Sequence, residues 1–178
     1  MIYQQVKNYY LSLTKKHPNM TFRTLLLVSV LFIYVQVKGQ QPTILPQFTF
    51  FKLDGKAFSN KNLVPGKKNL FMLFDVTCEH CQRESSLLNT NYAKFKDVNI
   101  YMITLDQAHI IPQFFNTYAK GLNTKPNVII LQDKNQLFIP SFLPKMYPAM
   151  YLYSSAGKLL GYNAGDGGVK KLMQVVGK

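Results

Sequence analysis

A short apolar run that leads directly into the only two cysteines of the chain is the feature that most constrains its fold. Residues 69–75, NLFMLFD, are bounded by loop-forming residues and have the length and composition of a buried β-strand. Cys78 and Cys81 follow in the sequence TCEHCQRE, and residues 82–96 then carry apolar side chains at helical spacing. We therefore predict that the cysteines lie where a buried strand turns into an α-helix.

The alternation of strand and helix continues toward the C-terminus. Residues 98–104 and 127–133 have the pattern of strands, and residues 110–120 have that of a helix between them. Residues 149–165 predict a strand, a turn and a second strand, and a short amphipathic helix follows. Near the start of this region, FTFFKLDGKAFS predicts a β-hairpin with a tight Asp-Gly turn. The predicted class is α/β, with a mixed central sheet flanked by helices.

The cysteine pair is better suited to reversible chemistry than to structural or metal-binding roles. A bridge across so short a loop removes little entropy from the unfolded chain. Covalent haem attachment needs a histidine directly after the second cysteine, where Gln82 stands. A zinc site normally has four ligands, and His80 is the only histidine close to the pair, with His17 and His109 elsewhere. We expect neither a metal nor a cofactor.

The N-terminal region has the composition of a targeting segment. Residues 24–37, TLLLVSVLFIYVQV, are almost wholly apolar and follow a region that contains no acidic residue. Fourteen residues at about 1.5 Å each are short for a hydrocarbon core of about 30 Å. We expect residues 1–39 to be a signal peptide or an N-terminal membrane anchor, residues 40–46 a linker and residues 47–178 the domain. The domain is then exported, either periplasmic or otherwise extracytoplasmic, and is held at the inner membrane if the segment is retained.

The net charge of +13 arises from 21 basic and 8 acidic residues. The lysines are scattered through predicted loops and form no block or helical stripe, so the sequence predicts no nucleic-acid interface. Two interpretations of the basic surface remain open. One is ordinary solvation, and the other is attraction to an anionic membrane surface or to acidic partners.

Taken together, these segments resemble the thioredoxin superfamily, and most closely its exported TlpA/ResA-like thiol-disulfide oxidoreductases. The resemblance runs from about residue 47 to the C-terminus. It rests on the CxxC motif with Glu84 three residues further on, on Pro148 just before a late strand, and on an extra strand and helix at about residues 107–144. It implies a thioredoxin-like fold with an N-terminal β-hairpin and this central insertion.

The resemblance also implies roles for single residues. Cys78 would be the exposed nucleophile and Cys81 the resolving thiol. Pro148 would be a cis-proline beside the sulfurs, where neighbouring backbone can pair with a substrate strand, or else an ordinary trans-proline. Glu84 would handle the proton of Cys81, or would be a charge on the helix surface. His80 would make the site more oxidising, or would be a solvent-exposed bystander.

The implied partners are exported proteins that contain disulfides or dithiols, together with an upstream membrane electron donor or acceptor. The chain itself is expected to be a monomer.

Two departures leave the reduction potential and the partner open. Thr77 stands where most relatives have tryptophan, and Met72 stands where thioredoxins bury an acidic residue. Other functions on the same fold also remain. A peroxiredoxin-like peroxidase needs a threonine three residues before its reactive cysteine, which this sequence lacks. A Sco-like copper-binding protein uses CxxxC rather than CxxC. A purely structural adaptor would leave the position of the cysteines unexplained.

Overall fold

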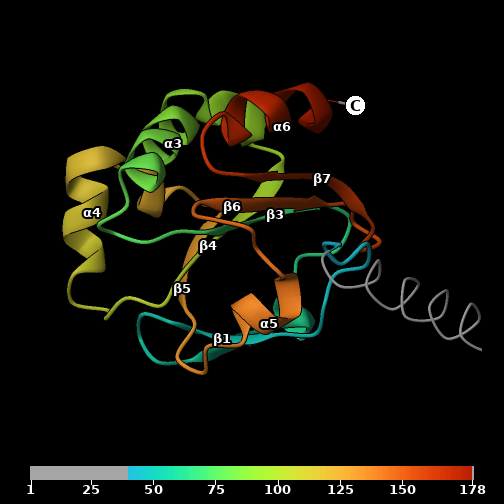
Figure 1. Cartoon of the computed structure of the whole chain (residues 1–178), viewed down its shortest axis with the longest axis horizontal. Coiled ribbons are helices and arrows are strands. Elements are labelled where there is room, and N and C mark those ends of the chain that lie inside the picture. The colour runs from blue at the N-terminus through green and yellow to red at the C-terminus, as the bar shows by residue number, and fades with distance from the viewer. Residues whose placement is uncertain (1–39, 178) are drawn as a thin grey trace, which may run out of the picture. The chain divides into compact units, whose positions relative to one another are not determined.

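The computed structural model of the protein describes residues 40–177 (Figure 1). The predicted signal peptide or anchor, residues 1–39, lies outside the described residues. Within residues 40–177, no helix combines the length and the apolar character that crossing a membrane requires. The compact unit that contains the cysteine pair begins at Gln41.

Seven strands form one mixed sheet in the order β2-β1-β5-β4-β3-β6-β7 (Figure 1). The strands are β1 Thr49–Lys52, β2 Ala57–Ser59, β3 Lys68–Leu73, β4 Val98–Thr104, β5 Val128–Gln132, β6 Ala149–Tyr153 and β7 Leu159–Ala164. β3, β4 and β5 are parallel, whereas the other neighbouring pairs are antiparallel. The helices are α3 Glu79–Thr90, α4 Ile111–Tyr118, α5 Phe138–Phe142 and α6 Gly168–Val176. The predicted mixed sheet flanked by helices is confirmed.

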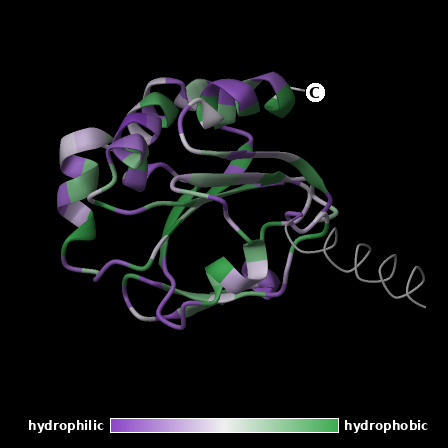
Figure 2. Ribbon diagram, in the orientation of Figure 1, coloured by the Kyte–Doolittle hydropathy of each residue, from purple (hydrophilic) through white to green (hydrophobic). Residues whose placement is uncertain are grey.

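The two faces of the sheet are covered by different kinds of side chain. Alternation along β3 directs Leu70 and Met72 to one face and Phe71 and Leu73 to the other. α3, α4 and α6 cover the first face, which is largely aliphatic and includes the second cysteine. The hairpin and α5 cover the second face with stacked phenylalanine and tyrosine rings. Figure 2 shows that the hydrophobic residues concentrate in the strands between these layers. The helix after the cysteine motif thus packs on the aliphatic face.

The predicted elements are present, most with bounds that differ by one or two residues, and the largest difference is in the helix after the cysteines. The predicted strands 69–75, 98–104 and 127–133 are β3, β4 and β5. The helix predicted over 82–96 is α3, which begins at Glu79 and ends at Thr90. A short 3-10 helix follows at Tyr92–Phe95. The break occurs because Asn91 leaves the helical conformation (φ −100°, ψ 17°). The backbone N–H and the side-chain amide of Asn91 both donate to the carbonyl of Leu87, at 3.0 Å and 2.9 Å.

Part of the predicted linker is fixed to the sheet. The backbone N–H of Leu45 donates to the carbonyl of Gly157 at 2.8 Å, and the N–H of Leu159 donates to the carbonyl of Thr43 at 2.8 Å. Residues 42–45, called the strap below, therefore lie along the turn between β6 and β7 and the start of β7.

Candidate active site

Cys78 occupies the exposed start of α3. It is the N-cap residue, with an extended backbone (φ −77°, ψ 116°), and its carbonyl accepts the first helical hydrogen bond from Gln82 N–H at 3.0 Å. Its own N–H donates to the carbonyl of Asp75 at 3.3 Å. The residue is partly exposed, whereas Cys81, one turn further along, is fully buried. The pair therefore consists of one accessible and one inaccessible thiol.

The two cysteines are free, and their side chains are close enough to form a hydrogen bond. Burial is the main cause that raises the pKa of Cys81, and the hydrogen bond and charge of Cys78 raise this pKa further. The backbone N–H of Asp75 donates to Cys81 Sγ at 3.5 Å and acts in the opposite direction. Cys81 is thus held as a neutral thiol in the reduced protein.

We expect the reduced protein to lose stability as the pH rises above about 8.5, the ordinary pKa of a thiol. Above that value the unfolded chain releases the Cys81 proton while the folded chain retains it, which favours unfolding by about 1.4 kcal/mol per pH unit. Urea unfolding under reducing conditions at about pH 7.5 and 9.5 should therefore differ by about 1.4 kcal/mol. Cys81→Ala should remove this difference. An equal loss in Cys81→Ala would show that another group is responsible.

The carboxylates of Asp75 and Asp106 accept hydrogen bonds from the loop before the first cysteine. Asp75 follows β3 and Asp106 follows β4, which are neighbouring parallel strands. Asp106 Oδ2 accepts from Val76 N–H at 2.9 Å and from Thr104 Oγ1 at 2.7 Å. Asp75 Oδ1 accepts from Thr77 N–H at 2.7 Å and from Thr77 Oγ1 at 2.6 Å. Asp106 was not among the site residues predicted from the sequence. A signal was available, because the carboxyl ends of parallel strands meet at one edge of a sheet.

Glu84 is buried, with 1% of its surface exposed, and both carboxylate oxygens are occupied. Oε1 accepts from Gly167 N–H at 2.6 Å, and Oε2 accepts from Val169 N–H at 2.8 Å. These donors belong to the start of α6, where N–H groups lack acceptors within the helix and a negative charge is favoured. Gly167 has a φ of +84°, which favours glycine. Placing Glu84 as a charge on the helix surface is therefore wrong, and its role with the proton of Cys81 stays a prediction.

His80 belongs to a partly exposed cluster of charged side chains. Its Nδ1 lies 2.6 Å from Asp166 Oδ2 and 2.6 Å from Arg83 Nη2. Arg83 Nη2 also donates to the same Asp166 oxygen at 3.0 Å, and Arg83 Nη1 lies 3.6 Å from Glu79 Oε2. The hydrogen bonds from Arg83 first, and from His80 second, hold the pKa of Asp166 below its usual value. Asp166 was not predicted from the sequence as a partner of His80, and the tuning role of His80 stays a prediction.

The predicted cis-proline is present, because the Tyr147–Pro148 peptide bond is cis. Pro148 is buried, and its carbonyl accepts from Gly165 N–H at 2.8 Å. Tyr147 packs against the core cluster that contains Cys81. Burial raises the pKa of Tyr147, and the nearby acidic groups Asp75 and Cys81 add to this effect. The proline loop therefore lies close to the buried thiol, while its contact with a substrate stays a prediction.

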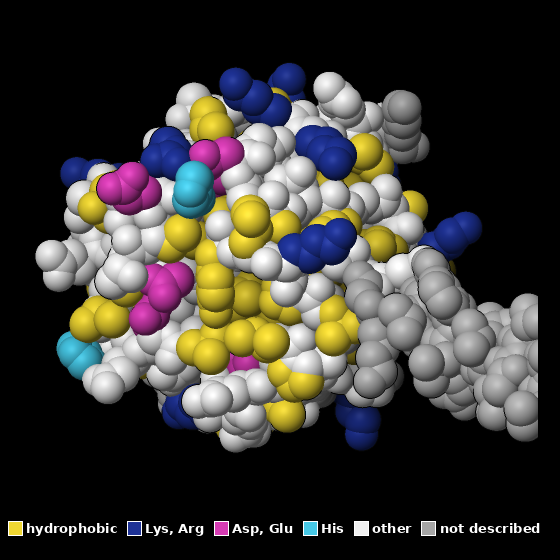
Figure 3. All heavy atoms as spheres, in the orientation of Figure 1, with side chains coloured by type: hydrophobic (Ala, Val, Ile, Leu, Met, Phe, Trp, Pro, Cys, Tyr) yellow, Lys and Arg dark blue, Asp and Glu magenta, His cyan; other side chains and the backbone are white. Residues whose placement is uncertain are grey.

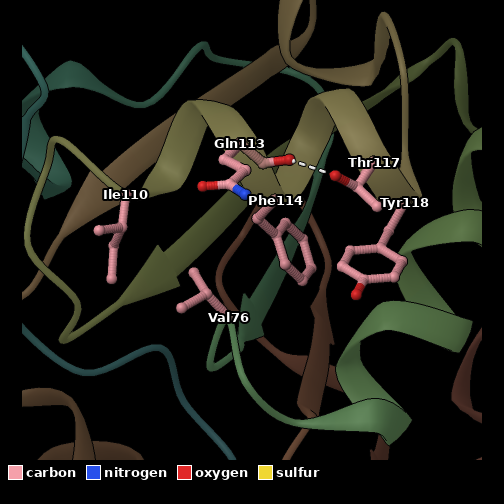
Figure 4. Close-up of a pocket in the computed structure, with 6 residues that line it drawn as sticks. All are labelled: Val76, Ile110, Gln113, Phe114, Thr117 and Tyr118. Carbon is pink, nitrogen blue, oxygen red and sulfur yellow. Dashed lines mark hydrogen bonds between the residues drawn. The ribbon is translucent and has the colours of Figure 1, made fainter.

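A groove opens between α3 and α4 beside the cysteine loop (Figure 4). One part has a volume of about 250 Å³ and is lined by Val76, Ile110, Gln113, Phe114, Thr117 and Tyr118. A second part, of about 360 Å³, shares the last two residues and is otherwise lined by α3 residues Glu79, Gln82, Arg83 and Ser86. α4 lies in the predicted insertion, which thus supplies one wall of the groove.

Exposed apolar side chains also precede the cis-proline. Ile139, Leu143 and Met146 expose 44%, 44% and 58% of their surfaces. Figure 3 shows a broad patch of hydrophobic side chains in the middle of the face in view, with charged side chains toward its rim. Among residues 40–177, no three or more His, Cys, Asp or Glu side chains are grouped as metal ligands.

No protein-family model matches the chain. The thiol-disulfide oxidoreductase ResA of Bacillus thuringiensis (strain Al Hakam) is 27% identical over 124 residues, which cover 68% of this chain and 68% of ResA. The structure of Mycobacterium tuberculosis DsbF in its mixed oxidised and reduced forms has a TM-score of 0.62 and 23% identity, and covers 78% of this chain and 98% of DsbF.

The structure of Arabidopsis thaliana ScoI with copper bound has a TM-score of 0.57 and 23% identity, and covers 75% of this chain and 96% of ScoI. These structures establish the thioredoxin-like fold. Since proteins of different activity share this fold, the fold alone does not select the chemistry.

Proposed function

We propose that this chain, which resembles the TlpA/ResA-like members of the thioredoxin superfamily, is a thiol-disulfide oxidoreductase that exchanges disulfides with partner proteins. The observation that carries the proposal is the pairing of a partly exposed Cys78, at the N-cap of α3, with a fully buried Cys81 one turn later. An accessible thiol beside an inaccessible one provides separate attacking and resolving groups.

The exchange requires only these two thiols. Cys78 gives up its proton and attacks one sulfur of a partner disulfide, so that a mixed disulfide forms and the first partner sulfur leaves as a thiolate. Cys81 then gives up its proton and attacks Cys78 Sγ, which releases the second partner sulfur. The partner disulfide is thereby reduced to two thiols while the pair becomes a Cys78–Cys81 disulfide. The reverse sequence oxidises a partner dithiol.

The surroundings of the pair support Cys78 as the attacking thiol and Cys81 as the resolving thiol. The burial of Cys81 restricts its reaction to a sulfur already joined to Cys78. The hydrogen bonds from Val76 and Thr77 to two aspartate carboxylates hold the loop that presents Cys78. The groove and the apolar patch before the cis-proline both offer surface on which a partner segment can pack. Pro148 is proposed to border this contact.

We further propose that the protein acts outside the cytoplasm, where disulfides persist, after export directed by residues 1–39. The apolar run at residues 24–37 supports this proposal. Its partners would be exported proteins with disulfides or dithiols, and a membrane electron donor or acceptor would return the pair to its working state.

Equilibration of the full chain with thiol buffers tests the proposed function. We expect a single two-electron transition with a potential between about −270 mV, as in thioredoxin, and about −120 mV, as in DsbA. Mass spectrometry after thiol alkylation should assign it to a Cys78–Cys81 disulfide, and Cys78→Ser should abolish it. Failure to form this disulfide in any buffer would overturn the proposal.

A further inference from the structure

The groove between α3 and α4 runs past the partly exposed cysteine. Its first part includes Val76, two residues before Cys78, and its second part includes Glu79, the residue after Cys78. Thr117 and Tyr118 line both parts and join them. We propose that this groove binds an extended segment of the partner protein that has a large apolar side chain close to its reacting cysteine and basic residues beside it. The inference rests on the proposed function and names the class of substrate that the site takes.

Chain geometry places the first part of the groove within reach of a residue near the attacked disulfide. Consecutive Cα atoms are about 3.8 Å apart, so the Cα atoms of Val76 and Cys78 lie within about 7 Å of each other. A disulfide holds the Cα atoms of its two cysteines about 4.4–6.8 Å apart. A partner residue two positions from the attacked cysteine covers the same span as Val76 does from Cys78. Its side chain can therefore enter the groove while the mixed disulfide exists.

The first part of the groove has the size and the lining for a large apolar side chain. Val76 from the cysteine loop faces the ring of Phe114 from α4 (Figure 4). Phe114 and Tyr118 are 3% and 38% exposed, and their ring centroids lie 5.6 Å apart. The volume of about 250 Å³ is below the roughly 300–1,000 Å³ of small-molecule sites. The groove therefore offers aromatic surface to a side chain, of the kind that anchors protein contacts.

Carboxylates outnumber basic groups where the groove meets the cysteine loop. Glu79 lines the groove with 83% of its side chain exposed, and Arg83 Nη1 lies 3.6 Å from its carboxylate. Arg83 also binds Asp166, at 3.0 Å, so one guanidinium serves two carboxylates. Asp75 and Asp106 accept hydrogen bonds from the loop, and in the described part of the chain neither forms an ion pair with a basic side chain. This region therefore has an excess of negative charge, although the whole chain carries +13.

This local charge favours a basic partner segment. Figure 3 shows acidic side chains beside a histidine toward the left of the face in view, whereas most Lys and Arg side chains lie around its rim. Complementary charge speeds the encounter of two proteins and orients them, and like charge disfavours the wrong partner. The groove thus selects a partner by an apolar anchor and by the charge next to it.

Peptide mixed disulfides test the apolar anchor with the reduced full chain. Each peptide has one cysteine joined to the coloured thiol thionitrobenzoate. Cys78 gives its proton to water and attacks the peptide sulfur, so that a Cys78–peptide disulfide forms while thionitrobenzoate, the better leaving group, departs as a thiolate. The peptide Phe-Gly-Cys-Gly-Phe presents a ring on either side of its cysteine. It should react about tenfold faster than Ala-Gly-Cys-Gly-Ala, because the ring is buried in the groove.

Two substitutions on α4 locate this preference. Thr117→Trp fills the junction of the two parts of the groove and should abolish the preference. Asn116→Trp is the matched control and should keep it, because Asn116 is exposed on the same helix and lines neither part. Each rate is divided by the rate at which iodoacetamide alkylates Cys78 in the same variant.

Three results would overturn the proposal. The first is an equal rate for the two peptides with the wild-type chain, and the second is loss of the preference in both variants. The third is a wild-type dimer in sedimentation that Thr117→Trp disrupts, because a second copy of the chain would then occupy the groove.

A second pair of peptides tests the charge. With lysine added at both ends, the phenylalanine peptide should react about two- to fivefold faster than with glutamate added at both ends, the range expected for exposed charged pairs. Glu79→Gln should reduce this ratio. Asp97→Asn should leave it unchanged, because Asp97 is exposed and precedes β4, at the end of the sheet opposite the cysteine loop. A faster reaction of the glutamate peptide would overturn the proposal.

These readouts separate the inference from the proposed function, because the release of thionitrobenzoate needs only Cys78. A chain that shows both preferences but forms no Cys78–Cys81 disulfide would support the groove as a binding site and contradict the proposed function. A chain that forms the disulfide but shows neither preference would overturn the inference alone.

Discussion

Replacing Glu84 by alanine is expected to lower the free energy of unfolding by about 4 kcal/mol, because two buried N–H groups lose their acceptors at about 1–3 kcal/mol each. The donors are Gly167 and Val169 at the start of α6, and only 1% of the surface of Glu84 is exposed. The same substitution detaches α6 from α3 at their buried contact. Urea unfolding should show a lower midpoint with an unchanged slope.

Two further variants make this result specific. Glu84→Gln keeps the size of the side chain but turns one acceptor into a donor, so it should cost about 2 kcal/mol. Glu79→Gln removes a charge from the exposed first turn of the same helix and should stay within about 0.5 kcal/mol of wild type. If Glu84→Ala were no more destabilising than Glu79→Gln, the buried cap would have no energetic importance.

Replacing Cys81 by serine is expected to stop turnover while leaving the first step of exchange intact. Cys78 remains partly exposed and still attacks a partner disulfide, but the hydroxyl of the new side chain cannot release the mixed disulfide. A covalent complex with a model disulfide protein should therefore accumulate, and net exchange should fall to the uncatalysed rate. Non-reducing electrophoresis and mass spectrometry should place the link at Cys78.

Cys78→Ser provides the matched control for this trapping experiment. Cys81 is fully buried, and burial keeps its thiol protonated, so it should form no mixed disulfide of its own. A complex joined through Cys81 would show that a partner reaches the buried sulfur. The assignment of attacking and resolving thiols would then have to be reversed.

Local patterns account for what the sequence could predict. The apolar run before the cysteines and the period of the helix after them are properties of neighbouring residues, and they placed the pair correctly at the end of β3 and the start of α3. The strand predicted over 98–104 is β4 with the same bounds. The cis-proline and the thioredoxin-like arrangement came from the resemblance to a family.

The remaining features depend on contacts between distant parts of the chain. Glu84 and its two backbone donors are separated by more than 80 residues, as are His80 and Asp166. No periodicity links such positions, because their meeting depends on how α6 returns to α3. The place of the N-terminal hairpin in the sheet is a similar case. β1 pairs with β5, and nothing in the sequence of either strand selects the other as its neighbour.

The strap along the sheet also bears on how copies of this protein behave toward one another. A free strand edge invites another chain to add to the sheet, and proteins usually blunt such edges. Here β2, at one edge, has three residues. At the other edge, the strap pairs with the start of β7 through Thr43 and Ile44, and a β-bulge interrupts the pairing of β6 with β7. Neither edge offers a long, regular strand for association. The exposed apolar side chains in the groove and before the cis-proline can therefore remain available to other proteins without promoting edge-to-edge polymerisation of the chain itself.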